Sequence, residues 1–399
     1  MTPVTSRAAR TAAWMLVLGL TGALAAPAAD TATRTRNFRQ PFPAQAAELR
    51  LANLAGRIEL VRGQGNQVVV DVTVHAAGSN ANETQKLLDG MKWVRSKDSK
   101  GRDEWALSYP VNDYSGFHYP RPGHRSEPSF LSFLDNSYSS TQYRGKRVRI
   151  YAQKRSGTPT LYAELKIALP ANSNVAVRNA VGAVRGQGQL EGTLSVDTGS
   201  GDVEIANHAG RMTIDTGSGD VTVGSTRGES RIDTGSGDVV VRKLVGNGNV
   251  DTGSGDVTVE NVSAGGLTID TGSGNVVVRQ GVAARVSADT GSGDVSVIDV
   301  EIEELQADTG SGDVTLRSSL AQARTVVAET GSGDVEIYGG PQASFDVQSS
   351  HGSGELLVRY DDADLRRSGR KVTGAKRGDG RTTIRVTTGS GDCVIGPKS

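Results

Sequence analysis

The sequence predicts an all-β protein whose second half is a right-handed parallel β-solenoid of about ten short rungs. Three observations point to this fold class. A heptapeptide recurs at a nearly fixed period, which is typical of stacked supersecondary units. Apolar residues alternate on both sides of each copy, as they do in strands. The chain of 399 residues holds 51 Gly but only 5% aromatic residues, a composition that favours many tight turns over a large aromatic core.

The heptapeptide reads D-T-G-S-G-D-V, and it occurs ten times if close variants are included. Successive copies begin 18, 18, 18, 19, 19, 19, 21, 21 and 37 residues apart, so the tenth follows a longer insertion. The copies begin at Asp197, Asp215, Asp233, Asp251, Asp270, Asp289, Asp308, Glu329, Ser350 and Thr387. Units of one length predict stacked coils in which each coil contacts only its neighbours.

Each unit is predicted as strand, tight turn, strand and looser turn. Met212 and Ile214 alternate before one copy of the motif, and Val221 and Val223 alternate after it. Two such short strands cannot close a core alone, but stacked units bury columns of Val, Ile and Leu. Connections between parallel strands are almost always right-handed, and this rule predicts the handedness of the coil.

The tight turns carry the polar residues of the repeat. Gly199 and Gly201 are expected to supply the positive φ angles that a tight turn needs. Thr198, Ser200 and Asp202 are expected to hydrogen-bond backbone N–H groups at the turn, and stacked copies are expected to bond to one another. The looser turns vary in sequence and length from unit to unit.

Stacked carboxylates raise the alternative of a calcium-binding β-roll. The segment G-S-G-D-V resembles half of a calcium-binding nonapeptide repeat, and two nonapeptides span about 18 residues. Against this, only one of the two turns in each unit carries the motif, and Asn275 replaces the acid in one copy. Calcium stays an alternative, and no other cofactor is predicted. The metal-ligand candidates are Asp197, Asp202, Asp215, Asp220, Asp233, Asp238, Asp251 and Asp256.

Catalytic chemistry finds little support. D-T-G-S also surrounds the carboxylate of aspartic proteases, but those enzymes need one carboxylate pair in a cleft, whereas this motif repeats on successive coils. The serines lack a recurring histidine, and His208 and His351 are predicted as isolated surface residues. A polysaccharide-active β-helix enzyme is the less favoured alternative, because its site needs a distinct acid–base pair. The chain is therefore predicted to be no enzyme, without catalytic residues.

Residues 27–178 are predicted as an N-terminal β-rich region, and residues 179–399 as the repeat solenoid. The first region carries one amphipathic helix over residues 82–94 and an insert at residues 110–145 that is rich in Pro, Gly, Ser, Tyr and Phe. The insert either caps the open end of the solenoid or forms a recognition loop. The ligand-contact candidates of the recognition loop are Tyr114, Phe117, Tyr119, Arg121, Phe130, Phe133, Tyr138 and Tyr143.

The N-terminal segment is predicted to be a cleaved secretory signal peptide. Residues 1–26 contain Arg7 and Arg10, then an apolar run, then a small-residue stretch that ends at Ala26. The apolar run is shorter than the roughly 20 residues of a spanning helix, so no membrane span is predicted in the mature protein. Cys393 is the only cysteine, which excludes an intramolecular disulfide. The protein is expected to be exported, either to the periplasm or to the cell surface and beyond.

Charge is balanced over the chain but not along it. The formal net charge is zero, which gives no reason to expect a nucleic-acid partner. Between Asp197 and Ile337 there are 23 acidic and 9 basic side chains, a net charge of −14, so the remainder carries +14. The solenoid is therefore acidic and its flanks are basic.

Several segments resemble one protein family. Residues 164–170 read E-L-K-I-A-L-P, residues 175–179 read V-A-V-R-N, and tandem T-G-S-G-D-V units follow. This order resembles a family of exported bacterial proteins classed as candidate adhesins, over roughly residues 46–397. The resemblance implies a right-handed β-helix-like fold and a cell-envelope location, and it supplies no catalytic residues. The aromatic insert and the basic stretch at residues 366–377 depart from it.

Together these features predict a non-catalytic binding or structural module of the cell envelope. The rod is expected to act as a scaffold, and the aromatic insert or the basic stretch as the contact surface. Aromatic faces and cations suit an envelope glycan or an envelope protein as the partner. The sequence sets no oligomeric state.

Overall fold

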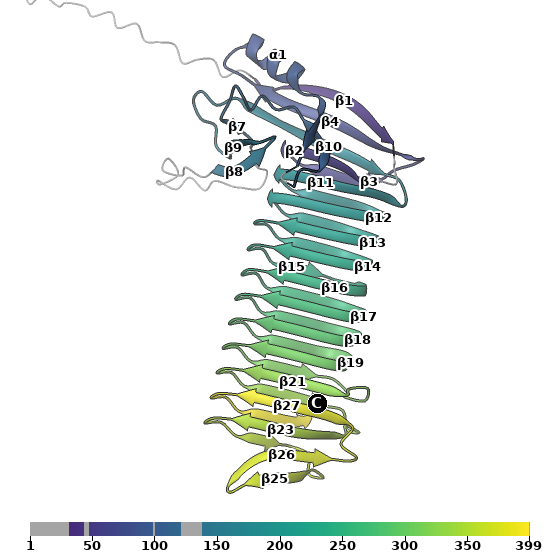
Figure 1. Ribbon diagram of the computed structural model, residues 1–399, viewed down its shortest axis with the longest axis vertical. Helices are drawn as coiled ribbons and strands as arrows, with labels where there is room; N and C mark the ends of the chain where they lie inside the picture. The colour runs from purple at the N-terminus through teal and green to yellow at the C-terminus, as the bar shows by residue number, and fades with distance from the viewer. Residues whose placement is uncertain (1–31, 44–47, 99, 121–137, 399) are drawn as a thin grey trace, which may run out of the picture.

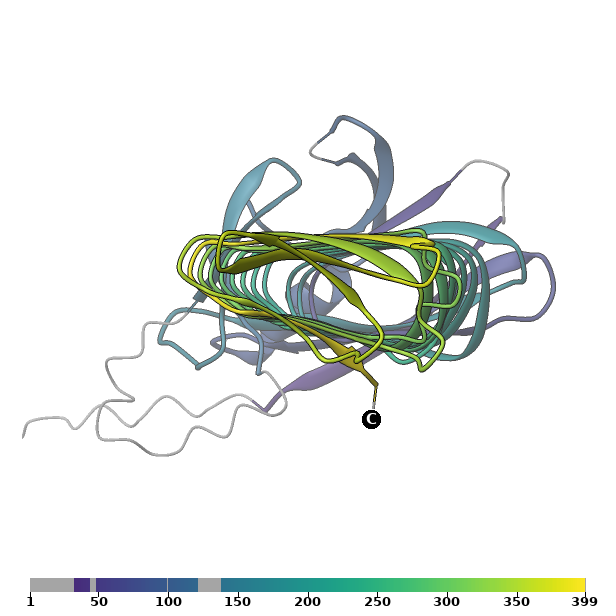
Figure 2. The same cartoon turned by 90° about the horizontal axis from the view of Figure 1, so that it is seen from below.

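The computed structural model describes residues 32–43, 48–98, 100–120 and 138–398. Figure 1 shows a long rod of stacked strands with a broader cap at its N-terminal end, and Figure 2, seen from below, shows each rung as a flattened loop. The described residues form 28 strands and one helix, so the predicted all-β class is confirmed. The predicted signal peptide lies outside the described residues.

The cap begins with antiparallel strands that cover the first rungs of the rod. Strand β1 (Arg34–Pro43) pairs with β4 (Gln67–Ala77), and β4 pairs with β10 (Thr160–Leu169). Helix α1 (Ala81–Gly90) packs against β4. The remaining cap strands are β5 (Trp93–Lys97), β6 (Asp103–Leu107), β7 (Gly116–His118), β8 (Tyr138–Tyr143) and β9 (Lys146–Tyr151).

Helix α1 is shorter than the sequence predicted. Asn80 caps its start, where the side chain accepts a 2.9 Å hydrogen bond from the Glu83 backbone N–H. Gly90 ends the helix, as a residue of low helix propensity, and Met91 is already extended. Val94, which was assigned to the helix, lies in β5 and pairs with Ala106 of β6.

The parallel ladder of the rod begins before the first D-T-G-S-G-D-V motif. Strands β2 (Leu49–Ala55) and β3 (Ile58–Arg62) pair in parallel with β11 (Ser173–Val181) and with the start of β12 (Val184–Ser200). These strands lie on both sides of the boundary predicted between residues 178 and 179. In place of the motif threonine they carry Asn53 and Asn179, which occupy the same register position as Thr198.

The repeats then stack in parallel, with motif residues in register. Asp215 pairs with Asp233 and Thr216 with Thr234, and the pattern continues down the rod. The strands are β13 (Val203–Thr216), β14 (Val221–Thr234), β15 (Val239–Val241), β16 (Leu244–Thr252), β17 (Val257–Thr271), β18 (Val276–Thr290), β19 (Val295–Thr309), β20 (Val314–Arg317), β21 (Thr325–Thr330) and β22 (Val335–Gly339). Inward side chains such as Val239 are fully buried.

Not every looser turn breaks the ladder. The sequence predicted a turn at residues 206–210, yet β13 runs through it and Asn207, His208 and Ala209 keep their parallel partners in β14. The chain bends there at Gly210, whose φ is 125°. A bend of this kind changes the strand direction at one residue while the backbone hydrogen bonds to the next rung continue.

The motif glycines are required for a reason other than the predicted one. Of the motif glycines, only Gly201 has a φ in the left-handed region, at 153°, so the expected positive φ is wrong for Gly199. A Cβ added to Gly255 would lie 1.9 Å from the carbonyl oxygen of Gly237 in the preceding rung. Glycine therefore occurs at these positions because stacked turns leave no space for a side chain.

The last repeat does not lie last in the stack. Strands β27 (Thr382–Thr388) and β28 (Cys393–Pro397) pair with β21 and β22 on one side, and with β23 (Phe345–His351) and β24 (Leu356–Val358) on the other. The chain thus passes one rung ahead and then returns to fill the gap. The hairpin of β25 (Asp364–Ser368) and β26 (Lys371–Arg377), which holds the basic stretch, pairs antiparallel with β23 and covers this end.

Candidate functional site

Most of the described ligand-contact candidates of the aromatic insert belong to the core of the cap. Phe117, Tyr119 and Tyr143 are buried, so their ring faces are covered by protein. The Tyr143 hydroxyl donates to the carbonyl oxygens of Leu107, at 2.8 Å, and of Ala52 in the first rung. These contacts hold the insert against the end of the rod, which is the arrangement of a cap.

The other insert candidates are less uniform. Tyr114 is half-buried and donates a hydrogen bond to Glu83, which raises the pKa of Tyr114 to about 12. Tyr138 is 45% exposed, and the Arg149 guanidinium carbon lies 5.1 Å from its ring centroid. Arg121, Phe130 and Phe133 lie outside the described residues.

The metal-ligand candidates lie in two columns along one edge of the rod. In the column that starts at Asp202, each side chain accepts a hydrogen bond from the backbone N–H of the next rung. Asp238 N donates to Asp220 Oδ1 at 3.0 Å, and Asp256 N donates to Asp238 Oδ1 at 2.9 Å. Asn275 serves equally well, because its amide oxygen accepts from Asp294 N at 2.9 Å. The column has a structural use that does not require a cation.

The column that starts at Asp197 faces outward. Burial, and then the charge of Asp215, raises the pKa of Asp197. Burial and the neighbouring carboxylates likewise raise the pKa values of Asp233 and Asp270. In each case burial is the larger cause, and the negative charge of the neighbouring carboxylates in the column adds to it. Within the described part of the chain, no three His, Cys, Asp or Glu side chains converge as a metal site would require.

His208 corrects a further expectation. It was predicted as a surface residue, but it is only 2% exposed and lies among the side chains of the rod interior, in register with Leu190 and Thr226. Neither ring nitrogen has a hydrogen-bond partner among the described residues. Burial lowers the pKa of His208. A neutral, buried imidazole of this kind is a packing residue.

A hollow lies on the cap. It is a groove of about 550 Å³ between the edge strand β1, the start of β2 and the β5–β6 hairpin. Its size falls in the range of small-ligand sites. The groove is lined by Arg36, Phe38, Gln40, Pro41, Phe42, Pro43, Glu48, Leu49, Arg50, Met91, Lys92, Trp93, Arg95, Asp103, Glu104 and Trp105.

Aromatic rings form one wall of the groove. The Phe42 ring lies between Trp93 and Trp105, with its centroid 5.6 Å from each of theirs. Phe42 is buried, whereas Trp93 and Trp105 are half-buried and keep part of their surface open. Strand alternation explains the grouping, because Trp93 and Arg95 lie on one face of β5 and Trp105 pairs with Arg95 across the hairpin.

Basic side chains border the rings. The Arg95 guanidinium carbon lies 5.2 Å from the Trp105 ring centroid, a cation–π contact. Arg95 and Lys92 make no ion pair among the described residues. Arg36 differs, because its Nη1 donates to the Leu88 carbonyl oxygen at 2.8 Å and so joins β1 to the end of α1. The free cations of the groove are therefore Lys92 and Arg95.

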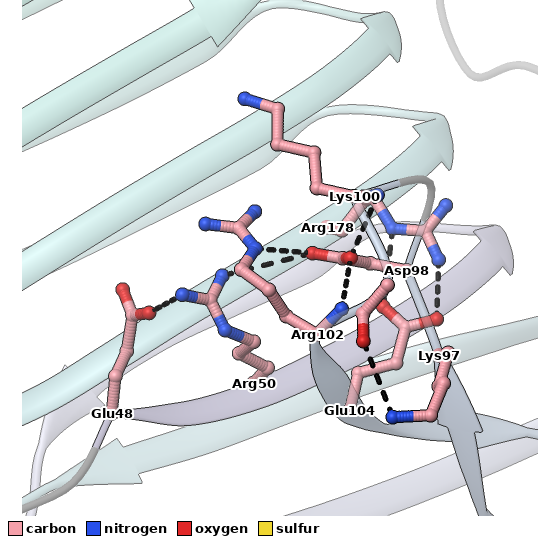
Figure 3. Close-up of polar contacts among 9 residues, drawn as sticks. Glu48, Arg50, Lys97, Asp98, Lys100, Arg102, Glu104 and Arg178 are labelled. Atoms are coloured by element: carbon pink, nitrogen blue, oxygen red, sulfur yellow. Dashed lines mark hydrogen bonds and ion pairs between the residues drawn. The ribbon is translucent and has the colours of Figure 1, made fainter.

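A network of charged groups fixes the hairpin against the rod (Figure 3). The buried Glu104 carboxylate, 5% exposed, receives a two-pronged contact from Arg178 of β11, with the closer N–O distance at 2.6 Å. Arg102 Nε donates to Asp98 at 2.6 Å, and Arg50 pairs with Glu48 and lies 3.9 Å from Asp98. Paired guanidinium and carboxylate forks hold a defined geometry.

The same network sets the charge state of the hairpin loop. Burial opposes ionisation of Asp98, but hydrogen bonds from the backbone and side chain of Arg102 outweigh it and hold the pKa of Asp98 below its usual value. Asp98 therefore keeps its negative charge at neutral pH. Because these acids are already paired within the network, the groove beside them presents its aromatic and basic groups without competition from a free carboxylate of that loop.

The groove was not among the predicted sites. The aromatic residues of the insert are close together in sequence, whereas Phe38, Phe42, Trp93 and Trp105 are spread over three strands. One sequence signal could have found it. Trp93 and Trp105 are two of the three tryptophans in the chain, and each has an arginine two or three residues away, at Arg95 and Arg102.

Comparisons with known proteins bear on the rod. Residues 244–395 match a family model, Toastrack DUF4097. This segment covers the lower repeats and the C-terminal rungs, which fits the solenoid-like arrangement seen here. No curated protein matches the sequence significantly. The described residues include no helix of the length and apolarity that crossing a membrane requires.

Two solved structures are similar over most of the chain. One is a candidate cell adhesion protein from Clostridium sporogenes ATCC 15579, with 9% identity, 92% of this chain and 100% of that chain covered, and a TM-score of 0.15. The other is a candidate adhesin from Parabacteroides distasonis ATCC 8503, with 11% identity, coverage of 90% and 97%, and a TM-score of 0.30. At such TM-scores the two likenesses support no inference about this chain.

Proposed function

We propose that this chain is an exported, non-catalytic binding module of the adhesin kind, in which the rod is a scaffold and the groove on the cap is the contact surface. The observation that carries the proposal is the combination of half-buried Trp93 and Trp105 with the unpaired cations Lys92 and Arg95 in one preformed hollow. The predicted signal peptide supports export, and cell fractionation of the full chain tests it.

The ligand that fits this surface is an envelope glycan. Indole faces pack against the apolar faces of sugar rings, and cations bind carboxylate or phosphate groups that many envelope polymers carry. The groove lies on the cap, at the end of the rod. A chain-like ligand could therefore enter it without contacting the turns that carry the motif carboxylates. The network around Glu104 and Arg178 keeps the hairpin in place, which lowers the entropy lost on binding.

The rod itself is a poor contact surface in this proposal. Its motif carboxylates from Asp202 onward are hydrogen-bonded to the next rung, and its motif threonines are buried. The outward aspartates carry repelling negative charge, which disfavours an anionic polymer. Ligand contact is therefore assigned to the groove residues of the cap, which lie outside the repeat motif.

The test is retention of the purified chain on isolated envelope glycans, with three variants. Trp105→Ala removes an indole face and Arg95→Gln removes a cation, and each is expected to weaken retention about tenfold, as truncation of a central interface residue does. The Arg95 side chain is exposed, so Arg95→Gln is expected to leave the fold intact. Tyr138→Ala is the matched control, because it removes an exposed ring of the cap outside the groove.

The variants separate the groove from the insert. Unchanged retention for Tyr138→Ala with loss for both groove variants supports the proposal. Loss for Tyr138→Ala with full retention of Trp105→Ala and Arg95→Gln would move the contact surface to the aromatic insert. Melting temperatures of all three variants show whether any loss comes from unfolding.

A further inference from the structure

A second hollow lies near the far end of the rod and has no part in the groove. It has a volume of about 340 Å³ and is lined by Arg317 of β20, Tyr338 of β22, Arg359, Pro397 of β28 and Lys398. Three of the five lining residues are cations. Arg317 belongs to the acidic part of the solenoid, whereas Arg359 and Lys398 belong to the basic C-terminal flank.

The returning last rung creates this hollow. Arg317 pairs with Tyr338 in parallel register, Tyr338 pairs with Gly396, and the Arg359 backbone N–H donates to Ile395 of the same strand at 2.8 Å. Gly396 thus lies between Tyr338 and Arg359. A Cβ at Gly396 would lie 3.5 Å from Arg359 and 3.6 Å from the Tyr338 ring, so the missing side chain leaves open space there.

Two guanidinium groups of the hollow are unpaired. Three other outward arginines of the rod pair with a glutamate one rung away: Arg185–Glu204 at 3.4 Å, Arg211–Glu229 at 2.8 Å and Arg285–Glu304 at 2.9 Å. Among the described residues, neither Arg317 nor Arg359 makes an ion pair. In the described part of the chain, one ion pair involves a lining residue of the hollow, Lys398 with Asp299 at 2.6 Å.

Tyr338 orients one of the two cations. The Arg317 guanidinium carbon lies 5.0 Å from the Tyr338 ring centroid, so the ring supports the guanidinium from one face and leaves its N–H groups for another partner. The charges sum to +2, from Arg317, Arg359 and Lys398 less Asp299. A dianion would neutralise this sum.

We propose that this hollow binds the phosphate group of a phosphate monoester. At neutral pH such a group carries a charge between about −1.5 and −2 and has three acceptor oxygens. Guanidinium groups bind phosphate oxygens in pairs, which gives both strength and orientation. The volume leaves room for a sugar-sized group beyond the phosphate. This site does not depend on the function proposed for the cap groove.

The experiment is calorimetric titration of the full chain with inorganic phosphate and, separately, with glucose 1-phosphate, at fixed ionic strength. Both are expected to bind, because they share the recognised group, and tighter binding of glucose 1-phosphate would identify an organic phosphate as the source. Arg317→Gln and Arg359→Gln are each expected to weaken binding about tenfold or more, since each removes a charged hydrogen bond.

Arg242→Gln is the matched control. Arg242 follows β15 at the equivalent outward position of an earlier rung and makes no ion pair among the described residues, so the charge change is the same and the hollow is untouched. The affinity of the Arg242→Gln variant for both phosphates is expected to stay within twofold of that of the unchanged chain. Absence of heat with both phosphates, or equal losses in Arg242→Gln and Arg359→Gln, would overturn the proposal, the second by showing general charge attraction only.

Discussion

The repeated turn edge of the rod and the groove of the cap use polar side chains in opposite ways. On the turn edge, Thr271 Oγ1 donates to the Gly255 carbonyl oxygen at 3.0 Å and accepts from Gly274 N at 3.2 Å, so the side chain is fully used inside the stack. In the groove, Arg95 and Lys92 have no ion-pair partner among the described residues. The threonine column of the edge is closed to a ligand, and the groove is open to one.

The difference follows from repetition. A residue that occurs in every rung meets its own copy above and below, and a buried polar group is stable only if its own turn or the neighbouring rungs satisfy it. The motif therefore selects residues such as Thr and Asp that bond to the next turn. Polar groups that bind another molecule must not be used up by hydrogen bonds inside the stack. Such groups occur where the repeat motif is absent, as in the cap, or where the repeat changes, as at Gly396.

The largest effect is expected when the buried side of the rod is charged. Val239→Asp places a carboxylate in a column that is fully buried and has no partner for it, and it should unfold several rungs. Val240→Asp is the control, since the neighbouring side chain of the same strand points outward. Circular dichroism and melting of both variants are the measurements. Equal stability of the two would contradict the assigned register.

The threonine column gives the next largest effect. Thr271→Val keeps the shape but removes both hydrogen bonds, leaving the Gly274 N–H unsatisfied, and should lower the free energy of unfolding by about 1–3 kcal/mol. Thr271→Ser keeps the hydroxyl and should lose less. Urea denaturation compares them. A valine variant as stable as the serine variant would show that the column contributes only packing.

His208 provides a pH-dependent test. Burial holds its pKa below the usual 6.5, so as pH falls below that value the unfolded chain takes up a proton first and the folded rod loses stability. His208→Leu, which matches Leu190 in the same column, should remove this loss and raise the free energy of unfolding by about 1 kcal/mol at pH 5. Melting at pH 7 and pH 5 measures it. A pH dependence unchanged by the substitution would assign it to other groups.

The smallest effect concerns the outward carboxylates. The pKa of Asp270 is raised by burial and by its neighbours Asp289 and Asp251, so replacing it with Asn removes repulsion. Asp270→Asn should raise the melting temperature by about 1 °C at low salt and by less at high salt, where charges are screened. Thermal melts in both conditions test this. A lower melting temperature of the unchanged chain in chelator would instead favour the calcium alternative.

The sequence predicted the repeated part of the fold well, because period and alternation report directly on stacked strands. The aspartate bonds between turns and those of the later threonines followed from the same pattern, but the buried Thr198 hydroxyl has no hydrogen-bond partner among the described residues. Two other features did not follow from the pattern. The spacing of the repeats shows an insertion before Thr387. Spacing carries no information on the order in which the rungs stack. A single turn taken alone predicts a positive φ at the motif glycines. Glycine is required there because two stacked turns lie in contact and leave no room for a Cβ.

The candidate site was harder to predict because it depends on tertiary contacts. Aromatic density marked the insert, yet Phe117 and Tyr143 are core residues of the cap, and density in sequence does not separate packing from recognition. The groove joins β1 to the β5–β6 hairpin across about fifty residues of chain, and no local pattern records that Phe42 reaches Trp93 and Trp105.

Hydrogen exchange of the full chain with and without a bound envelope glycan tests the central claim most directly. The account predicts slower exchange in β1, β5 and β6 around the groove and no change in the turns from Gly199 to Gly391. Protection that followed the turns down the rod, with β5 and β6 unaffected, would contradict it, because the repeated edge would then be the surface that meets the ligand.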